Sequence, residues 1–210
     1  MKQNPLILAL TGRPDVGKDT IGELLQQQGF ARIAFADALR TEVAGAWRVD
    51  ARILTDRYTK ETPLPCMAAG MCSEPGFIQW VADAGHSITE PRSPRWALQF
   101  WATYQRRNAP GYYADILARR IGRLQGSGWN RIVVTDLREA IEETMLRFNG
   151  AVVVRVHRPD ARPLPAETAT HSSEGHGAIK AQADIVNDGT LQALAEAVQQ
   201  LLRHFEAEAA

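Results

Sequence analysis

Apolar residues along this chain fall into short continuous runs separated by stretches of helical periodicity. Residues 5–11 form such a run, and 31–35, 131–136, 151–157 and 183–186 are further short, mainly apolar segments. A continuous apolar run of about four to eight residues is typical of a strand that is covered on both faces, as in a parallel sheet. The pattern therefore predicts buried strands at these five places.

Helical periodicity fills the gaps between the runs. After Gly17, the apolar residues Ile21, Leu24 and Leu25 share one helix face, and Gly29 is placed to end that helix. Further helices are predicted over 38–47, 94–107, 112–125, 139–148 and 190–205. Alternating strands and helices predict an α/β fold of three layers, α/β/α, with a central parallel sheet and a ligand outside the carboxyl ends of its strands.

Two stretches interrupt this alternation. Residues 50–90 contain several prolines and glycines and one short helical pattern at 77–84, which indicates an irregular insertion. Residues 158–177 contain three prolines and no apolar period, which predicts a mobile flap. We expect a single domain over 1–210, with an inserted helical part at about 38–128 and a lid at about 158–178.

Composition narrows the class of protein. With 210 residues, 45% of them apolar, the chain can bury a substantial core, so the collagen-like, disordered and disulfide-scaffold classes are excluded. The two cysteines fit a reducing compartment, and no apolar run approaches the ~20 residues of a membrane span. We therefore expect a cytoplasmic protein with no membrane partner.

The balanced charge of the chain hides a cluster of arginines. Basic and acidic residues number 24 each, which does not indicate a protein that coats nucleic acid. Eight arginines nevertheless lie between Pro91 and Arg131, where Asp115 is the only acid. Because the arginine fork grips phosphates and carboxylates, this cluster favours a small anionic ligand. Interleaved aromatic residues leave single-stranded nucleic acid as a less favoured alternative.

A glycine-rich motif stands between the first predicted strand and the first predicted helix. Residues 12–20 match the pattern G-x-x-x-x-G-K, in which backbone N–H groups and a helix N-terminus surround a triphosphate and Lys18 reaches its outer phosphates. The motif predicts ATP binding by Gly12, Asp15, Val16, Gly17, Lys18, Asp19 and Thr20.

Two carboxylates near this motif are candidates for magnesium. Asp19 stands where most such loops have a serine or threonine; it either holds Mg²⁺, directly or through water, or complements the helix dipole. Asp136 ends a buried strand, a usual place for a carboxylate that organises Mg²⁺. Arg138 follows closely, so the two residues form either a phosphate-facing pair or a salt bridge.

The helix predicted from Pro94 carries a polar face. Arg95, Gln99 and Arg106 are four and eleven residues apart, which places them within about 40° of one another around the helix. This face is either a reader of an anion and a base or a solvated surface.

Six motifs, in order, resemble those of the phage-type deoxynucleoside monophosphate kinases, which belong to the P-loop nucleoside and nucleotide kinase superfamily. They are G-K-D-T at 17–20, F-A-D-A-L-R at 35–40, R-x-x-L-Q-x-x-x-T at 95–103, D-L-R at 136–138, H-S-S-E at 171–174 and N-D-G-T-L at 187–191. The chain departs from the family at Ala102, where glycine is usual, and in the F-x-N-E that often follows D-V-R, of which Glu142 alone agrees. The insertion from Cys66 to Cys72 has no counterpart in it.

The resemblance implies transfer of the ATP γ-phosphate to a (deoxy)nucleoside 5′-monophosphate, with Mg²⁺ held by Asp19 and Asp136. It implies catalytic roles for Lys18, Asp136, Arg138 and Arg158. The acceptor would contact Asp37, Arg95, Gln99, Arg106 and Arg138. The lid would contribute Arg158, Arg162, His171 and Glu174. Asn187 and Gly189 would border adenine, cap the last helix, or do both.

Other functions stay open beside this one. The chain is alternatively a P-loop kinase for another phosphorylated metabolite, such as phosphomevalonate, or an ATP-binding regulatory protein that has lost transfer. A zinc site from Cys66, Cys72 and His86 is a weak alternative. We expect small-molecule substrates and no nucleic-acid partner, and the sequence leaves open whether the chain forms a homodimer.

Overall fold

The computed structural model describes residues 5–56, 58–159 and 179–208. The chain divides into two compact units, one formed by Met1–Phe35 with Ala114–Ala210 and the other by Ala36–Tyr113. The second unit covers most of the helical part expected at about 38–128, and residues 114–126 cluster with the first unit. The lid residues Arg162, His171 and Glu174 lie outside the described residues, and their roles stay predictions.

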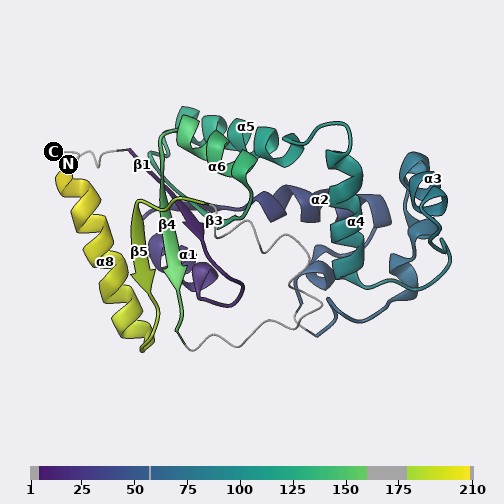
Figure 1. Ribbon diagram of the computed structural model, residues 1–210, viewed down its shortest axis with the longest axis horizontal. Coiled ribbons are helices and arrows are strands. Elements are labelled where there is room, and N and C mark those ends of the chain that lie inside the picture. The colour runs from purple at the N-terminus through teal and green to yellow at the C-terminus, as the bar shows by residue number, and fades with distance from the viewer. Residues whose placement is uncertain (1–4, 57, 160–178, 209–210) are drawn as a thin grey trace. The chain divides into compact units, whose positions relative to one another are not determined.

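A parallel sheet forms the centre of the first unit. In the described part of the chain its five strands are β1 (Leu6–Thr11), β2 (Ala31–Ile33), β3 (Arg131–Leu137), β4 (Ala151–His157) and β5 (Ala183–Val186). Their order is β2-β3-β1-β4-β5, and every neighbouring pair is parallel (Figure 1). These strands confirm the predicted fold class and bring the chain out of β1, β3 and β4 at one edge of the sheet.

Helices cover this sheet. α1 (Lys18–Gln27) and α8 (Leu191–Glu208) pack Ile21, Leu25 and Val198 into one core with Leu8 and other strand residues. Ile7 and Ala9 alternate with the residues of that core and are themselves buried, so the opposite face is covered as well. α5 (Tyr112–Gly126) precedes β3 and α6 (Ala140–Phe148) follows it, and α6 contacts β4.

The second unit is helical and has an aromatic core. It contains most of α2 (Phe35–Trp47), then α3 (Pro75–Asp83), α4 (Pro94–Arg106) and 3₁₀ turns at Ala51–Leu54, Pro65–Met67 and Ala69–Met71. The rings of Trp47, Phe77, Trp101 and Tyr104 meet at centroid distances of 5.2 to 5.8 Å. Ser93 caps α4: its Oγ accepts a hydrogen bond of 3.1 Å from the Trp96 N–H.

One carboxylate joins three aromatic side chains of this unit. Glu42 of α2 accepts hydrogen bonds from Trp101 Nε1 at 2.9 Å, from the Tyr112 hydroxyl at 2.8 Å and from the Tyr113 hydroxyl at 3.0 Å. Burial, followed by the charge of Glu42, raises the pKa of Tyr113 well above its ordinary value, so this hydroxyl stays a donor. Glu42 therefore fixes α2, α4 and the start of α5 to one another.

Two helix boundaries differ by three residues from those predicted. α2 begins at Phe35 rather than at residue 38, because Asp136 Oδ1 accepts the Phe35 N–H at 2.8 Å and satisfies a donor of the first turn. α8 is capped by Thr190, whose Oγ1 accepts the Ala193 N–H at 3.2 Å, and it continues to Glu208. No described helix is both long and apolar enough to cross a membrane.

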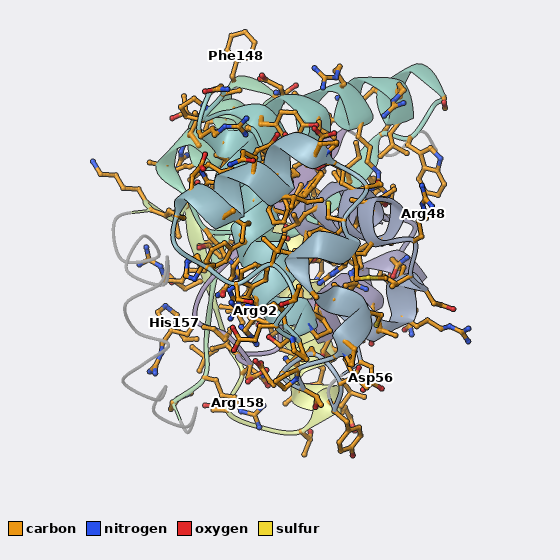
Figure 2. The ribbon with its side chains drawn as sticks, turned by 90° about the vertical axis from the view of Figure 1, so that its right-hand side faces the viewer. Arg48, Asp56, Arg92, Phe148, His157 and Arg158 are labelled. Atoms are coloured by element: carbon orange, nitrogen blue, oxygen red, sulfur yellow. The ribbon has the colours of Figure 1, made fainter. Side chains whose placement is uncertain are left out.

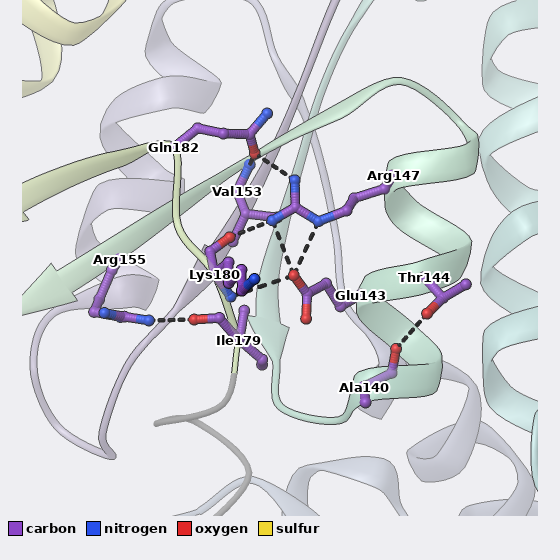
Figure 3. A network of polar contacts seen from close by, with 9 residues as sticks. All are labelled: Ala140, Glu143, Thr144, Arg147, Val153, Arg155, Ile179, Lys180 and Gln182. Carbon is purple, nitrogen blue, oxygen red and sulfur yellow. Dashed lines mark hydrogen bonds and ion pairs between the residues drawn. The ribbon is translucent and has the colours of Figure 1, made fainter.

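Residues 179–182 are tied to α6 and β4 by a polar network (Figure 3). Arg147 donates from Nε to Glu143 Oε1 and from Nη1 to Gln182 Oε1, each at 2.9 Å, and also contacts the Lys180 carbonyl. Gln182 Oε1 accepts the Val153 N–H as well, at 2.8 Å. The chain therefore enters β5 from a point fixed against α6.

We expect Arg147→Ala to lower the free energy of unfolding by about 1–3 kcal/mol, because several charge-assisted hydrogen bonds are lost together. Urea unfolding followed by circular dichroism measures this change. Thr144→Ala on the same helix is the matched control, since among the described residues Thr144 Oγ1 bonds only to the Ala140 carbonyl of its own helix (Figure 3); we expect its effect to stay within about 0.5 kcal/mol. Equal losses in the two variants would contradict the role given to the network.

Candidate functional site

The loop between β1 and α1 is built on two glycines that no other residue can replace without displacement. Gly12 has a φ of 136°, and a Cβ there would lie 2.4 Å from the Val156 carbonyl oxygen. Gly17 has a φ of 104°, and its Cβ would lie 2.5 Å from Asn187 Nδ2. Between them, Asp15 takes a φ of 60°, which Asp tolerates better than most residues. The loop is therefore pressed against the strand ends on two sides.

Asn187 holds this loop in place. Its Nδ2 donates a hydrogen bond of 2.9 Å to the Val16 carbonyl, and its backbone N–H donates one of 2.7 Å to the His157 carbonyl. The side chain of Val16 is buried in the core and its carbonyl is bonded to Asn187. Val16 would therefore meet a ligand through its backbone N–H. Asn187 thus links the ends of β4 and β5 to the loop, whereas the cap of α8 is Thr190. That Asn187 and Gly189 border adenine stays a prediction.

Lys18 begins α1 and turns back over the loop. Its Nζ donates hydrogen bonds of 2.7 Å to the carbonyls of Gly12 and of Arg13. Burial, and then the charge of Arg138, lowers the pKa of Lys18 to about 8, although Asp19, Asp136 and Asp15 act in the opposite direction. Lys18 therefore stays mostly protonated at neutral pH, and Thr20 follows it, half-buried, in the first turn of the helix.

Asp136 lies beside the loop because β3 neighbours β1. Thr11 is in register with Leu137, which places the residue before Leu137 next to the start of the loop. One oxygen of Asp136 accepts the Phe35 N–H. Arg138 is exposed, and its guanidinium makes no hydrogen bond or ion pair within the described part of the chain. The alternative of a salt bridge between Asp136 and Arg138 is therefore not what the structure shows.

Asp19 has a partner that the sequence did not indicate. Its Oδ1 lies 2.6 Å from Arg32 Nη2, on the neighbouring strand β2. The described residues contain no group of three or more His, Cys, Asp or Glu side chains that could hold a metal ion, so the zinc alternative gains no support. A Mg²⁺ site needs fewer protein ligands, because the ion commonly takes one or two carboxylates together with waters and substrate phosphates. Asp136 and Asp19 fit that lesser requirement.

A buried carboxylate supports the turn that carries Arg138. Glu142 Oε2 accepts the N–H groups of Arg138 at 2.9 Å and of Glu139 at 3.1 Å, as part of a capping box at the start of α6. Burial raises the pKa of Glu142 to about 7. Glu142 was not among the predicted site residues, although it is the residue that agrees with the family pattern after D-L-R, and that agreement was the available signal.

The predicted acceptor residues lie mostly in the second unit. Arg95 pairs with Glu61, Nε to Oε1, at 2.5 Å, and Gln99 is exposed. The Arg106 guanidinium lies over the Tyr113 ring, 5.5 Å from its centroid. Asp37 is in the first turn of α2, 3.8 Å from Arg40. α4 buries Ala97, Trp101 and Tyr104 on its other side, so the three predicted α4 residues share a polar face, as the spacing indicated.

Arg158 follows β4, and its side chain is exposed (Figure 2). The residue before it, His157, pairs with Asp184 of β5 through Nε2 and Oδ1 at 2.8 Å. Because the Val156 carbonyl meets Gly12 and the His157 carbonyl meets Asn187, the end of β4 that carries Arg158 borders the loop. A catalytic role for Arg158 stays a prediction.

Comparison with known proteins identifies the fold family. No family model matches the chain, and no curated protein matches it. Among solved structures, dephospho-CoA kinase from Campylobacter jejuni is 14% identical and has a TM-score of 0.51, with 97% of this chain and 98% of that chain covered. The chain has the P-loop kinase fold.

Two further structures are similar at lower scores. Shikimate kinase from Acinetobacter baumannii in complex with shikimate is 13% identical with a TM-score of 0.44, over 96% of this chain and 94% of that one. A sugar kinase from Janibacter sp. HTCC2649 is 14% identical with a TM-score of 0.47, over 95% of each chain. At 14% identity, the likeness to dephospho-CoA kinase shows the fold and no particular substrate.

The buried carboxylate Glu142 predicts a pH dependence of stability. Its pKa is higher in the folded chain, about 7, than its ordinary value of 4.5, so the folded state binds more protons between these values. Wild-type unfolding free energy should therefore fall, relative to Glu142→Gln, as pH rises from 5 to 8, by at most roughly 3 kcal/mol. Urea titrations of both proteins at a series of pH values measure the difference. A difference that does not change with pH would show that Glu142 is not held as inferred.

Proposed function

We propose that the protein is an ATP-dependent phosphotransferase that converts a (deoxy)nucleoside 5′-monophosphate to the diphosphate. The observation that carries the proposal is the site at the carboxyl edge of the sheet, where Lys18 closes a glycine-rich loop and Asp136 stands beside it. The P-loop kinase fold supports phosphoryl transfer, and the six sequence motifs support the nucleotide acceptor.

The donor half of the reaction follows from this loop. Backbone N–H groups at the start of α1 and the Lys18 ammonium would bind the outer phosphates of ATP in place of the two loop carbonyls that Lys18 now contacts. Asp136, with Asp19, would hold Mg²⁺ through its water shell, and the ion would neutralise charge on the β- and γ-phosphates. Arg138, carried by a turn that Glu142 fixes, would supply a further positive charge.

The transfer itself needs little covalent chemistry from the protein. An oxygen of the acceptor phosphate attacks the γ-phosphorus in line, the bond from that phosphorus to the β-γ bridging oxygen breaks, and ADP leaves. The chain's work is to position the two phosphates and to offset their repulsion. We propose Asp37, Arg95, Gln99, Arg106 and Arg138 as acceptor contacts, and Arg158 with the lid residues Arg162, His171 and Glu174 as groups that close over the transfer.

The deciding experiment is an acceptor panel. Purified protein is given ATP, Mg²⁺ and, separately, deoxynucleoside monophosphates, ribonucleoside monophosphates and phosphomevalonate, and ADP release is measured. We expect turnover with at least one nucleoside monophosphate. Turnover with phosphomevalonate alone would assign the other phosphorylated acceptor, and ATP binding without ADP release from any acceptor would favour a regulatory protein.

We expect Lys18→Met to lower kcat by about 10²–10³-fold or more, because a preorganised charge on the transferring group is lost. The matched control is Lys180→Met, since the Lys180 side chain is exposed and its described contacts use backbone atoms. Steady-state kinetics and a circular dichroism melt are recorded for both variants. Near-normal turnover in a folded Lys18→Met variant would remove the loop from the mechanism.

We expect Arg95→Gln to raise the acceptor KM at least tenfold with little change in the KM for ATP, because one bidentate phosphate contact is lost. Glu61→Gln serves as a companion variant: it removes the present partner of Arg95 and should leave the acceptor KM unchanged or lower. A larger effect on the KM for ATP would place this face of α4 on the donor side.

A further inference from the structure

The ion pair between Asp19 and Arg32 lies where the phosphate loop passes into α1. Oδ1 of Asp19 and Nη2 of Arg32 are 2.6 Å apart, and the two side chains are 80% and 31% exposed. Asp19 directly follows Lys18 in the first turn of α1, and Arg32 is the middle residue of the three-residue strand β2. A residue of the donor loop is therefore held by a strand that has no other contact with the loop among the described hydrogen bonds.

The space for the Arg32 stem is made by a glycine inside α1. A Cβ at Gly22 would lie 3.0 Å from Arg32 Nε and 3.1 Å from its Cδ, and 2.6 Å from Thr135 Cγ2. Glycine in a helix interior costs at least as much stability as an exposed ion pair usually returns. Gly22 also lets α1 lie close to Thr135 of β3, so the glycine serves packing on the sheet as well, and it is the position of the ion pair beside Lys18 that points to a further role.

Charge at the loop shows what Arg32 does there. Three carboxylates, those of Asp15, Asp19 and Asp136, act on Lys18, against one nearby cation, Arg138. With Lys18, Arg138 and Arg13 of the loop itself, three positive charges stand against these three negative ones, which leaves no excess of positive charge for a polyanionic triphosphate. Arg32 adds a further positive charge, and it does so at Asp19, the acid that replaces the usual serine or threonine.

We propose that Arg32 is a positioning residue of the donor site, which neutralises and holds the carboxylate of Asp19 so that the loop accepts a triphosphate. The proposal rests on the proposed function in its donor half, ATP binding, and does not depend on the acceptor. It assigns a joint role to Asp19, Gly22 and Arg32, which the sequence motif treats as unrelated positions.

The test is a double-mutant cycle read by equilibrium binding to the full chain. The dissociation constant for ATP is measured by calorimetry with Mg²⁺ and again with EDTA for wild type, Arg32→Gln, Asp19→Ser and the double variant. We expect Arg32→Gln to weaken ATP binding about tenfold in EDTA and less in Mg²⁺, because Mg²⁺ itself offsets phosphate charge. In the Asp19→Ser background, Arg32→Gln should change the dissociation constant for ATP less than twofold. In the otherwise wild-type chain, Arg32→Lys should retain most of the ATP affinity that Arg32→Gln loses.

Two controls make the result specific. Arg52→Gln breaks another exposed Arg–Asp pair, with Asp50 at 2.5 Å, and should leave ATP binding unchanged. Thermal melts of each variant without nucleotide show that it is folded. Two outcomes would overturn this inference alone, provided that the wild-type chain binds ATP. One is an equal loss of ATP affinity from Arg32→Gln in the wild-type and Asp19→Ser backgrounds, and the other is no loss of affinity in either. Failure of the wild-type chain to bind ATP would instead overturn the proposed function, and this inference with it.

Discussion

The site depends on a close approach of backbone to backbone at the carboxyl edge of the sheet. Gly12 lies against the Val156 carbonyl, and Gly17 lies under Asn187, so the loop is confined by β4 on one side and by the residue after β5 on another. A side chain at either glycine would force the loop outward, and both glycines also take positive φ values. A loop held in this way keeps its N–H groups in place before any ligand arrives, which is the preorganisation that phosphate binding needs.

The groups around the loop are held by contacts within the protein. Glu142 binds the backbone at Arg138, Arg32 binds Asp19, and Asp136 itself accepts the Phe35 N–H. The first two contacts use an ionisable side chain to fix the direction of another group, and the third fixes Asp136 itself. Holding a group in this way costs free energy at Glu142, because a buried carboxylate is less stable than one in water. The raised pKa of Glu142 reflects that cost.

Much of the fold was predictable from the sequence, because it rests on local pattern. Apolar runs located all five described strands, and the helix predicted from Pro94 starts at that residue. The glycine-rich loop was predictable for the same reason, since its spacing is contiguous. The partners of the site were not: Arg32 lies 13 residues from Asp19, Phe35 lies 101 from Asp136, and Asn187 lies 171 from Val16. Pairs of this kind form only once the strands are in order, and a single sequence has no periodicity that marks them.

The same reasoning explains why Asn187 was assigned to a ligand when its described contacts are to the protein. A polar residue next to a predicted strand end and before a helix looks alike whether it binds a base, caps a helix or bonds to a distant carbonyl. The parallel order β1-β4-β5 explains the last of these contacts, because it brings the end of β5 within reach of the Val16 carbonyl, two strands away. Thr190 then takes the cap of α8, and the amide of Asn187 is left to hold the loop. Sheet order thus converts a residue that the motif marks only as polar into part of the wall that shapes the phosphate site.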